Sequence, residues 1–289
     1  MAAVAKAPVA IMHGPGDLDH LSADRFSRLA GLIYDETGIK MPRTKATMLE
    51  GRLRRRLRDT GAATLNAYCD LLFADPNAND EIDHLVNAVT TNKTDFFREP
   101  GHFEFLEKVA LPTIAATGQR RIRAWSAACS TGAEPYTMAM VMDRFVQARG
   151  GEYGILATDI DTEVLEAARR GIYDAPLVDP VPSMLRQRYV AASRDRKAGK
   201  VRITPDLRAA IGFARLNLMD ARYPVGEPMD IIFCRNVLIY FDKPTQEKVV
   251  RRLCDCLRPG GYLFLGHSET IAGMDLPVKT VSYTVFERC

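Results

Sequence analysis

Residues that bind metals or cross membranes are scarce in this 289-residue sequence, and their scarcity excludes several classes of protein. Its six cysteines form no CxxC pair and its five histidines do not cluster, so we expect no metal site. Most cysteines lie inside apolar runs, where a thiol behaves as a small buried hydrophobe. No segment approaches the roughly 20 apolar residues of a membrane-spanning helix. We therefore expect a cytoplasmic protein with reduced thiols and no direct membrane insertion.

Phosphate-binding loops are also absent, because neither GxGxxG nor GK[ST] occurs in the chain. The net charge of +3 is too small to indicate a nucleic-acid-binding protein by itself. Positive charge gathers instead between Lys40 and Arg58, where eight basic residues accompany one acid, Glu50. This cluster indicates an acidic partner surface, with a solvated helix face as an equal alternative.

The first part of the chain has helical patterns. Residues 1–18 contain prolines and glycines without a long apolar core, so we interpret them as a disordered tail and not a signal peptide. Over residues 19–90 apolar side chains recur on one helix face, and no strand pattern precedes residue 120. A small all-α domain is therefore predicted. Its helices begin after a cap at Ser22 and near Thr44, and cover 64–73 and 79–91.

From residue 121 onward, strand and helix patterns alternate. The alternation predicts an α/β domain with a mainly parallel sheet and helices on both of its faces. The predicted strands are 121–127, 153–159, 213–218, 229–234 and 262–266, and the predicted helices are 133–147, 162–170 and 244–257. Residues 278–287 resemble one final antiparallel edge strand. Prolines and a charged run interrupt the alternation over about 174–212, where we predict a small antiparallel insertion.

The loop after the first predicted strand, 126–132, is the default binding site, because ligands of open α/β sheets lie beyond the carboxyl ends of the strands. Glu134 follows this loop and would repel a phosphate, so the ligand should carry positive charge. Asp159 ends the next strand, at the place where a ribose diol is bound. A ribose with a cationic tail and no phosphate describes S-adenosylmethionine. The alternative is that both residues are structural. Glu134 would then be an acid of the first helical turn, favoured by the helix dipole, and Asp159 would cap the helix at 162–170.

Two further stretches carry polar groups that suit a binding site. In TTNKTDFFREP, residues 90–100, four hydrogen-bonding side chains precede Arg98, which can hold a carboxylate with two hydrogen bonds. In IIFCRNVLIYFDKP, residues 231–244, a buried strand is followed by Tyr240, a candidate active-site hydroxyl. The alternatives are aromatic packing in both stretches and a surface position for Arg98. His267 lies near the same edge, and we expect it to position other groups or to make a structural hydrogen bond rather than to catalyse.

Five motifs together resemble those of the chemotaxis receptor protein-glutamate methyltransferases of bacteria, the CheR family. They occur in this order behind a helical domain, and the similarity spans about residues 22–289. The motifs are TTNKTDFFREP, WSAACSTGAEPY, ATDIDTEVLEAARRGIY, FCRNVLIYFD and LRPGGYLFLGHSE.

The resemblance implies a fold and a reaction. The fold is a helical domain (19–90), a linker that contributes to the cofactor site (91–100), and a Rossmann-like class I methyltransferase domain (101–289). The small antiparallel β-subdomain is inserted into the last of these. The reaction is methyl transfer from S-adenosylmethionine to glutamate side chains on the cytoplasmic helices of chemotaxis receptors.

The resemblance also implies which residues do this. The cofactor contacts fall on Asn92, Thr94, Arg98, Glu134, Asp159, Asn217, Leu218, Arg235 and Asn236. Arg98 and Tyr240 match positions with catalytic or positioning roles. The basic helix matches the surface that meets the receptor, with Arg52, Arg54, Arg55, Arg56 and Arg58.

The sequence departs from the family pattern at one place. Some family members dock on a pentapeptide at the receptor's C-terminal tail through a glycine-rich turn of the β-subdomain. Residues 191–203 read AASRDRKAGKVRI, with Gly199 as the only glycine, so we expect action that does not depend on this tether. Two other functions remain as alternatives: a signalling adaptor that binds cofactor or receptor without turnover, and a methyltransferase acting on RNA. The second is disfavoured because no stacking surface rich in aromatic residues is apparent.

Overall fold

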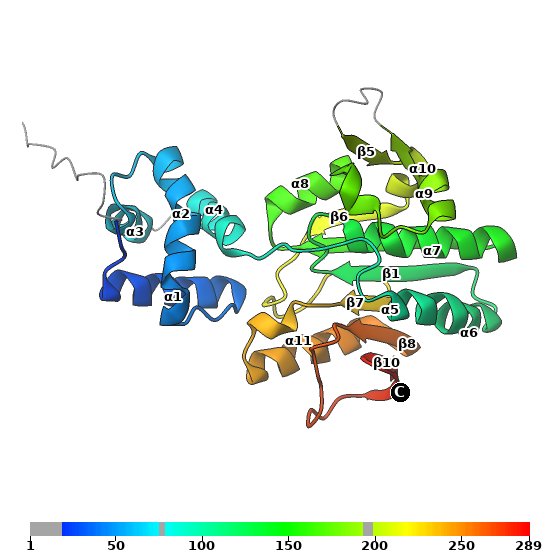
Figure 1. The fold of residues 1–289 in the computed structure, drawn as a ribbon. Coiled ribbons are helices and arrows are strands. Elements are labelled where there is room, and N and C mark those ends of the chain that lie inside the picture. The colour runs from blue at the N-terminus through cyan, green and yellow to red at the C-terminus, as the bar shows by residue number, and fades with distance from the viewer. Residues whose placement is uncertain (1–18, 75–78, 193–198) are drawn as a thin grey trace, which may run out of the picture.

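The computed structural model describes residues 19–74, 79–192 and 199–289. Helices α1 to α4 lie beside an α/β part, and an extended segment over residues 90–99 joins the two (Figure 1). The predicted order, helical first and α/β second, is therefore confirmed. The helical part consists of α1 (Ala23–Thr37), a 3-10 turn η1 (Arg43–Lys45), α2 (Ala46–Thr60), α3 (Leu65–Ala74) and α4 (Asn79–Val89).

The first helix shows how local sequence sets the boundaries of this part. The Ser22 hydroxyl accepts a hydrogen bond from the Arg25 amide at 3.3 Å, as expected of an N-cap. Gly38 ends the helix in the left-handed region, with φ 71°. Leu29 and Ile33 point into a small apolar core shared with α2 and α3. Burial of each such side chain contributes about 1.5–3 kcal/mol.

The main sheet has the strand order β6-β2-β1-β7-β8-β10-β9. The pairs from β6 to β8 are parallel, while β10 is antiparallel to both β8 and β9, so the prediction of a mainly parallel sheet is confirmed. The strands are β1 (Arg121–Ala127), β2 (Glu152–Asp159), β6 (Ile211–Arg215), β7 (Met229–Cys234), β8 (Leu257–Leu265), β9 (Val278–Ser282) and β10 (Val285–Arg288).

Helices cover both faces of the main sheet, and the strands are buried accordingly. Alternate side chains of β7 enter opposite cores: Ile231 and Phe233 join one, and Ile232 and Cys234 join the other. The first core packs against α5, α6 and α7, and the second packs against α11. The helices are α5 (Pro100–Phe105), α6 (Leu111–Ala116), α7 (Ala133–Arg149), α8 (Thr162–Arg170) and α11 (Lys243–Cys256), with 3-10 turn η5 (Leu238–Tyr240) before α11.

Three details differ from the sequence-based expectation. Residues 100–116, for which no element was expected, form α5, a π-helical turn η2 (Leu106–Ala110) and α6 in one continuous stretch. Residues 278–287 are not a single strand, because a turn at Tyr283 and Thr284 divides them into β9 and β10. Strand β8 already begins at Leu257, so the Pro-Gly-Gly sequence lies within its irregular start and not before it.

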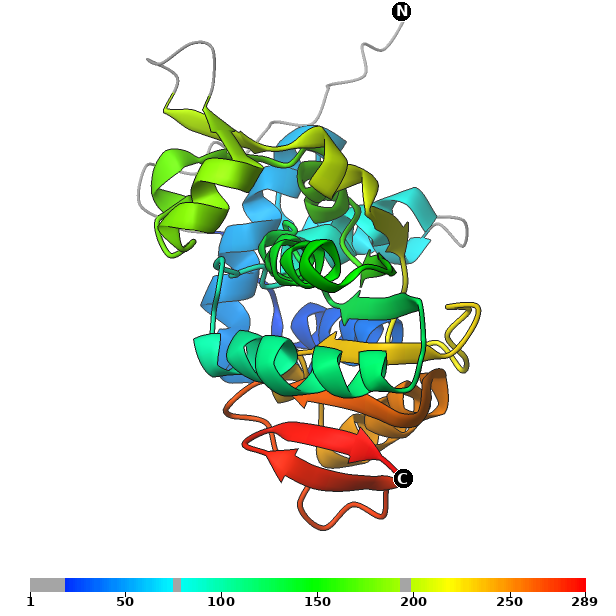
Figure 2. The same cartoon turned by 90° about the vertical axis from the view of Figure 1, so that its right-hand side faces the viewer.

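The predicted antiparallel insertion is present and begins two residues earlier than expected, at Ile172. Its small sheet has the order β3-β5-β4 and lies at the opposite end of the α/β part from the β9–β10 hairpin (Figure 2). The insertion consists of β3 (Ile172–Asp174), a 3-10 turn η3 (Ala175–Val178), α9 (Ser183–Tyr189), β4 (Val190–Ala192), β5 (Lys200–Ile203) and α10 (Pro205–Ala209). Residues 193–198, part of the stretch on which the tether prediction rests, lie outside the described residues. Residues 1–18 also lie outside them.

Helices long and apolar enough to cross a membrane do not occur in the parts of the chain that the structure describes.

Candidate active site

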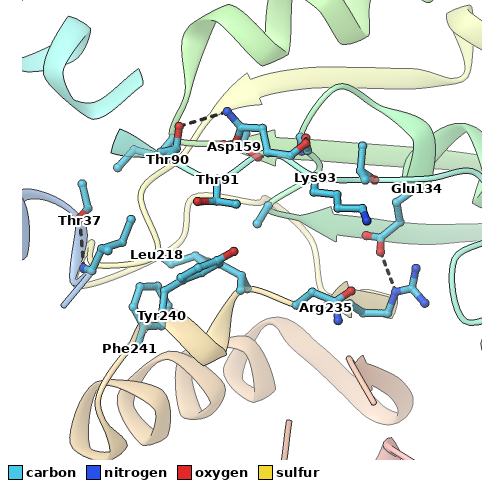
Figure 3. A pocket seen from close by; sticks show the side chains of 18 of the residues that line it. Thr37, Thr90, Thr91, Lys93, Glu134, Asp159, Leu218, Arg235, Tyr240 and Phe241 are labelled. Atoms are coloured by element: carbon cyan, nitrogen blue, oxygen red, sulfur yellow. Dashed lines mark hydrogen bonds and ion pairs between the residues drawn. The ribbon is translucent and has the colours of Figure 1, made fainter. Parts of the chain in front are cut away.

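A cavity of about 900 Å³, including the part open to solvent, lies at the carboxyl edge of the main sheet. Figure 3 shows side chains from the linker, from the sheet edge and from the end of α1 surrounding it. The predicted site residues, scattered over some 150 positions of sequence, all line this one cavity. They are Asn92, Thr94, Arg98, Glu134, Asp159, Asn217, Leu218, Arg235, Asn236 and Tyr240.

The loop after β1 approaches the cavity with its backbone in unusual conformations. Ala128 and Ser130 have φ values of 67° and 51°, a region that side chains other than glycine rarely adopt. At Gly132, with φ 93°, an added Cβ would lie 2.9 Å from the Cβ of Ala168, so only glycine fits there. Such strain is typical of binding sites, where surrounding contacts must maintain it. The small residues of this loop therefore serve close packing and close approach to the cavity.

Asp159 holds this loop in place from the next strand. Its carboxylate accepts hydrogen bonds from the Ser130 amide at 2.8 Å and the Asp161 amide at 3.0 Å. Burial raises the pKa of Asp159 to about 6, although its backbone hydrogen bonds act in the opposite direction. The alternative role of Asp159 as a helix cap is wrong: Asp161 caps α8, accepting from the amides of Glu163 and Val164.

Glu134 has partners within the protein. One carboxylate oxygen accepts a hydrogen bond from the Ser126 hydroxyl at 2.7 Å, and the other accepts from the Arg235 Nε at 2.7 Å. Glu134 still lines the cavity (Figure 3), but its charge is balanced by Arg235. The site therefore contains a buried ion pair between Glu134 and Arg235. Glu134 also lies in the first turn of α7, as the structural alternative for it predicted.

Arg235 is the most deeply held cation of the site, with 2% of its side chain exposed. Besides Glu134, its guanidinium contacts the Glu99 carboxylate at 3.3 Å and donates to the Arg98 carbonyl at 2.8 Å. Glu99 also accepts from the Asn236 side chain at 3.1 Å, and its own backbone has a positive φ of 59°. Arg235 thus connects α7, the linker and the end of β7.

Sequence reasoning missed two acids that support this site. Glu99 is one, and Glu269 is the other. The buried Glu269 carboxylate accepts from the amides of Gly266, Asn236 and Leu238 at 2.6, 3.0 and 2.8 Å. It thereby fixes the turn after β7 that carries Asn236. An acid two residues after His267, just beyond the carboxyl end of β8, was the available signal.

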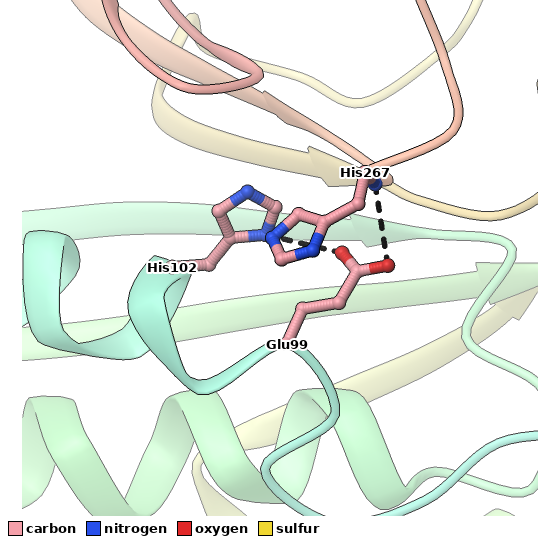
Figure 4. A group of neighbouring side chains, drawn as sticks. All are labelled: Glu99, His102 and His267. Atoms are coloured by element: carbon pink, nitrogen blue, oxygen red, sulfur yellow. Dashed lines mark hydrogen bonds and ion pairs between the residues drawn. The ribbon is translucent and has the colours of Figure 1, made fainter.

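Glu99, His102 and His267 form a group whose ligand atoms lie within 4.8 Å of one another (Figure 4). A cation already contacts two of them, because a guanidinium nitrogen of Arg235 lies 3.0 Å from His102 Nδ1 and 3.3 Å from Glu99. Burial, and next the charge of Arg235, lower the pKa of His102 to about 4, so this imidazole is neutral near pH 7. We assign the group to holding Arg235, with the His267 amide donating to Glu99 at 3.2 Å.

Arg98 and Tyr240 both line the cavity. Arg98 is half-buried and donates one hydrogen bond, at 3.1 Å, to the Lys93 carbonyl. The Tyr240 side chain points into the cavity, as does that of Lys93, which sequence reasoning did not select (Figure 3). Phe96, by contrast, is buried in the core, as the packing alternative predicted for it.

The helical part supplies one wall of the cavity. Thr37 and Ile39, at the end of α1, both line it, and the Asn217 side chain donates to the Glu36 carbonyl at 2.6 Å. Tyr34 donates to Asp242 at 2.9 Å across the same contact. No local pattern indicates a site at the end of α1, because these residues become site residues only through the contact between the two parts.

The arginines of the basic helix α2 differ in whether their side chains are bound within the protein or exposed. Arg52 donates to the carbonyls of Val89 and Thr90, Arg54 donates to the Asp19 carbonyl, and Arg56 forms a two-bond pair with Glu81. Arg55 and Arg58 are exposed, and within the described residues neither side chain has a hydrogen-bond or ion-pair partner. The surface available to a partner is therefore smaller than the charge count indicated.

A mainly parallel sheet with helices on both faces, and a cavity at its carboxyl edge that lacks a phosphate-binding loop, fit an S-adenosylmethionine-dependent methyltransferase. Comparison with known families agrees. The model described as "CheR methyltransferase, SAM binding domain" matches residues 92–286, and "CheR methyltransferase, all-alpha domain" matches residues 24–90. The chain belongs to the CheR methyltransferase family.

Curated relatives resemble the chain over nearly its whole length. Chemotaxis protein methyltransferase 2 of Pseudomonas aeruginosa is 38% identical over 267 residues, which is 92% of this chain and 94% of that protein. The chemotaxis protein methyltransferase of Escherichia coli is 40% identical over 270 residues, covering 92% and 91%. That of Borreliella burgdorferi is 35% identical over 260 residues, covering 88% and 90%. The chain is thus an enzyme that uses S-adenosylmethionine for methylation in chemotaxis.

Proposed function

We propose that this protein transfers the methyl group of S-adenosylmethionine to glutamate side chains in the cytoplasmic helical region of chemotaxis receptors. The products are glutamate methyl esters and S-adenosylhomocysteine. The observation that carries the proposal is the convergence of all the predicted cofactor residues, with Arg98 and Tyr240, on one cavity.

The lining of the cavity fits this cofactor. The carboxylates of Glu134 and Asp159 suit the amino-acid portion and the ribose hydroxyls of the cofactor. Apolar side chains that follow β2 and β6, and two that flank η5, offer a surface for a base; they are Ile160, Leu216, Leu218, Val237 and Phe241. When bound, the cofactor supplies a methyl group that its sulfonium makes reactive.

The protein's own groups contribute binding, orientation and exclusion of water. Arg98 holds a carboxylate in the cavity, and the Tyr240 hydroxyl orients the acceptor. A glutamate, with an ordinary pKa of about 4.3, is already ionised at pH 7, so no general base has to remove a proton. For methyl transfer, the cavity would therefore have to align the glutamate oxygen with the methyl group that the bound cofactor would supply, and to keep water away. Favourable orientation alone can contribute roughly 7–11 kcal/mol to such a step.

The receptor-facing surface is proposed to be α2, with its exposed arginines Arg55 and Arg58 in the leading role. Their positive charges suit an acidic helix that carries methylatable glutamates, and they steer its approach over about a Debye length. Arg54 precedes them on the helix, is half-buried and donates to the Asp19 carbonyl. Arg52 and Arg56 contribute charge to this face while their side chains are bound internally.

The experiment is calorimetry with S-adenosylhomocysteine, followed by transfer of a tritiated methyl group to membranes that contain receptor. We expect binding, transfer, and release of the label as methanol in mild alkali, as for a carboxyl methyl ester. Binding without transfer would favour the adaptor alternative. Label that is stable to alkali would exclude the ester. Transfer of the label to RNA would favour the alternative of a methyltransferase acting on RNA.

We also propose that methylation does not require a tether at the receptor's C-terminal tail. The proposal rests on the single glycine, Gly199, of the stretch that would form the docking turn. Receptors with and without their tails should be methylated at similar rates. A strict requirement for the tail would overturn this part of the proposal.

A further inference from the structure

Arg52 differs from the exposed arginines of α2 in what its side chain contacts. One guanidinium nitrogen donates to the carbonyls of Val89 and Thr90, at 2.5 and 2.6 Å, and another donates to the Thr91 hydroxyl at 3.0 Å. Val89 is the last residue of α4, where helix carbonyls lack intrahelical partners and carry partial negative charge. Arg52 therefore stabilises the end of α4 and the first residues of the linker.

These linker residues are part of the cavity wall. Thr90 and Thr91 both line the cavity, together with Asn92. The Thr90 hydroxyl and the Asn92 side chain each donate to the same oxygen of Asp161, both at 2.7 Å. Arg52 thus holds the linker from the helical side, and Asp161 holds it from the α/β side.

The contacts continue from Asp161 to the floor of the site. The Asp161 amide donates to Asp159 at 3.0 Å, and the Ser130 amide donates to the other Asp159 oxygen at 2.8 Å. Ser130 also contacts the linker directly, because its hydroxyl donates to the Asn92 carbonyl at 2.8 Å. The position of the linker and that of the loop after β1 are therefore fixed by one set of hydrogen bonds.

We propose that Arg52 is a positioning residue of the cofactor site, and that its main role is not contact with the receptor. The inference deepens the proposed function, since it rests on the proposed cofactor contacts of Asn92 and Asp159. It does not depend on which acceptor is methylated. Arg52 acts through the linker, because its own guanidinium contacts the linker and does not line the cavity.

The test measures S-adenosylhomocysteine affinity by calorimetry on the full chain, in the absence of receptor. Arg52→Gln removes charge-assisted hydrogen bonds to the linker, so we expect its dissociation constant to rise about tenfold. Arg55→Gln removes the same charge from the same helix and should instead raise the KM for receptor, with cofactor affinity within about twofold of wild type. Arg52→Lys retains the charge and one donor, and should recover part of the affinity.

Amide hydrogen exchange distinguishes positioning from general loss of structure. In Arg52→Gln we expect faster exchange confined to residues 89–94, partly reversed by S-adenosylhomocysteine. An unchanged dissociation constant in Arg52→Gln, with a receptor KM raised as in Arg55→Gln, would overturn the proposal. If Arg52→Gln does not fold, Arg52→Lys decides: an intermediate affinity supports the proposal, and wild-type affinity contradicts it.

Discussion

The cavity and the helix α2 are both rich in charge, but the two regions hold their charge in different ways. Arg235 in the cavity is buried between Glu134 and Glu99, whereas Arg55 on α2 is exposed to solvent. A buried charge must have partners inside the protein, so the fold determines what it does. An exposed charge is worth little until a partner arrives, and its effect is screened by salt. The comparison predicts large, salt-insensitive effects in the cavity and small, salt-sensitive effects on α2.

The largest effect is expected at Arg98. Arg98→Ala should reduce cofactor affinity or turnover by orders of magnitude, because it removes a group proposed to hold a carboxylate at the reacting end. Calorimetry and initial rates at several cofactor concentrations would separate the two losses. Arg98→Lys is the matched control and should recover only part of the activity. Normal methylation by Arg98→Ala would refute the assigned role.

Tyr240 offers the next effect in size. Tyr240→Phe keeps the ring in the cavity and removes the hydroxyl, so we expect kcat to fall about tenfold or more while S-adenosylhomocysteine affinity changes little. Steady-state kinetics with receptor, compared with calorimetry, provides the measurement. Equal losses in both quantities would instead assign the Tyr240 hydroxyl to cofactor binding and not to the acceptor.

The exposed arginines of α2 should give a smaller and different effect. Arg55→Gln combined with Arg58→Gln should raise the receptor KM several-fold with kcat almost unchanged, since exposed pairs contribute about 0.2–1 kcal/mol each. Raising the ionic strength should increase the receptor KM of the wild type more than that of the double variant. A double variant that matches wild type at low salt would remove α2 from the docking surface.

The smallest effect concerns pH. Asp159 has a raised pKa of about 6 in the folded protein, so protonation below that pH removes the negative charge proposed to accept from the ribose. The dissociation constant of S-adenosylhomocysteine should therefore rise about fourfold at pH 5.5, and Asp159→Asn should abolish this dependence. A pH-independent constant in wild type would contradict the role of Asp159.

The same raised pKa has a consequence for stability. The folded protein binds the Asp159 proton more tightly than the unfolded chain does, because the pKa of this carboxyl is near 3.8 in the unfolded chain. The contribution of Asp159 to the unfolding free energy therefore falls as pH rises from about 3.8 to about 6, and stays low above that range. Asp159→Asn should flatten this part of the stability profile in urea titrations.

Sequence patterns predicted the architecture because apolar residues recur with a clear period in most helices and strands. The period reflects whether one face or both faces of the element are buried. The alternation from residue 121 onward located the parallel sheet, and the polar residues that follow its strands met at one edge, as such sheets require. The turn at Tyr283 and Thr284 was missed because neither residue belongs to the usual turn formers. Residues 100–116 showed no recognised pattern, although they form a continuous helical stretch against the sheet.

The parts of the site that the sequence could not predict depend on contacts between residues far apart in the chain. Glu99 and Arg235 lie 136 positions apart, and only the fold brings the acid of the linker to the cation after β7. The wall formed by Thr37 and Ile39 depends likewise on contact between the two parts of the chain. On α2 the spacing of arginines identified a basic helix, but it could not show that Arg52 reaches the carbonyls at the end of α4.

The measurement that tests the central claim most directly is the location of the transferred methyl group on the receptor. Receptor-containing membranes would be incubated with S-adenosylmethionine and either wild-type protein or Arg98→Ala, and receptor peptides analysed by mass spectrometry. We predict methyl esters on glutamates of the cytoplasmic helices with wild type, and few or none with the variant. Methyl groups on other residue types, or no methylation of a receptor from the same organism, would contradict the account.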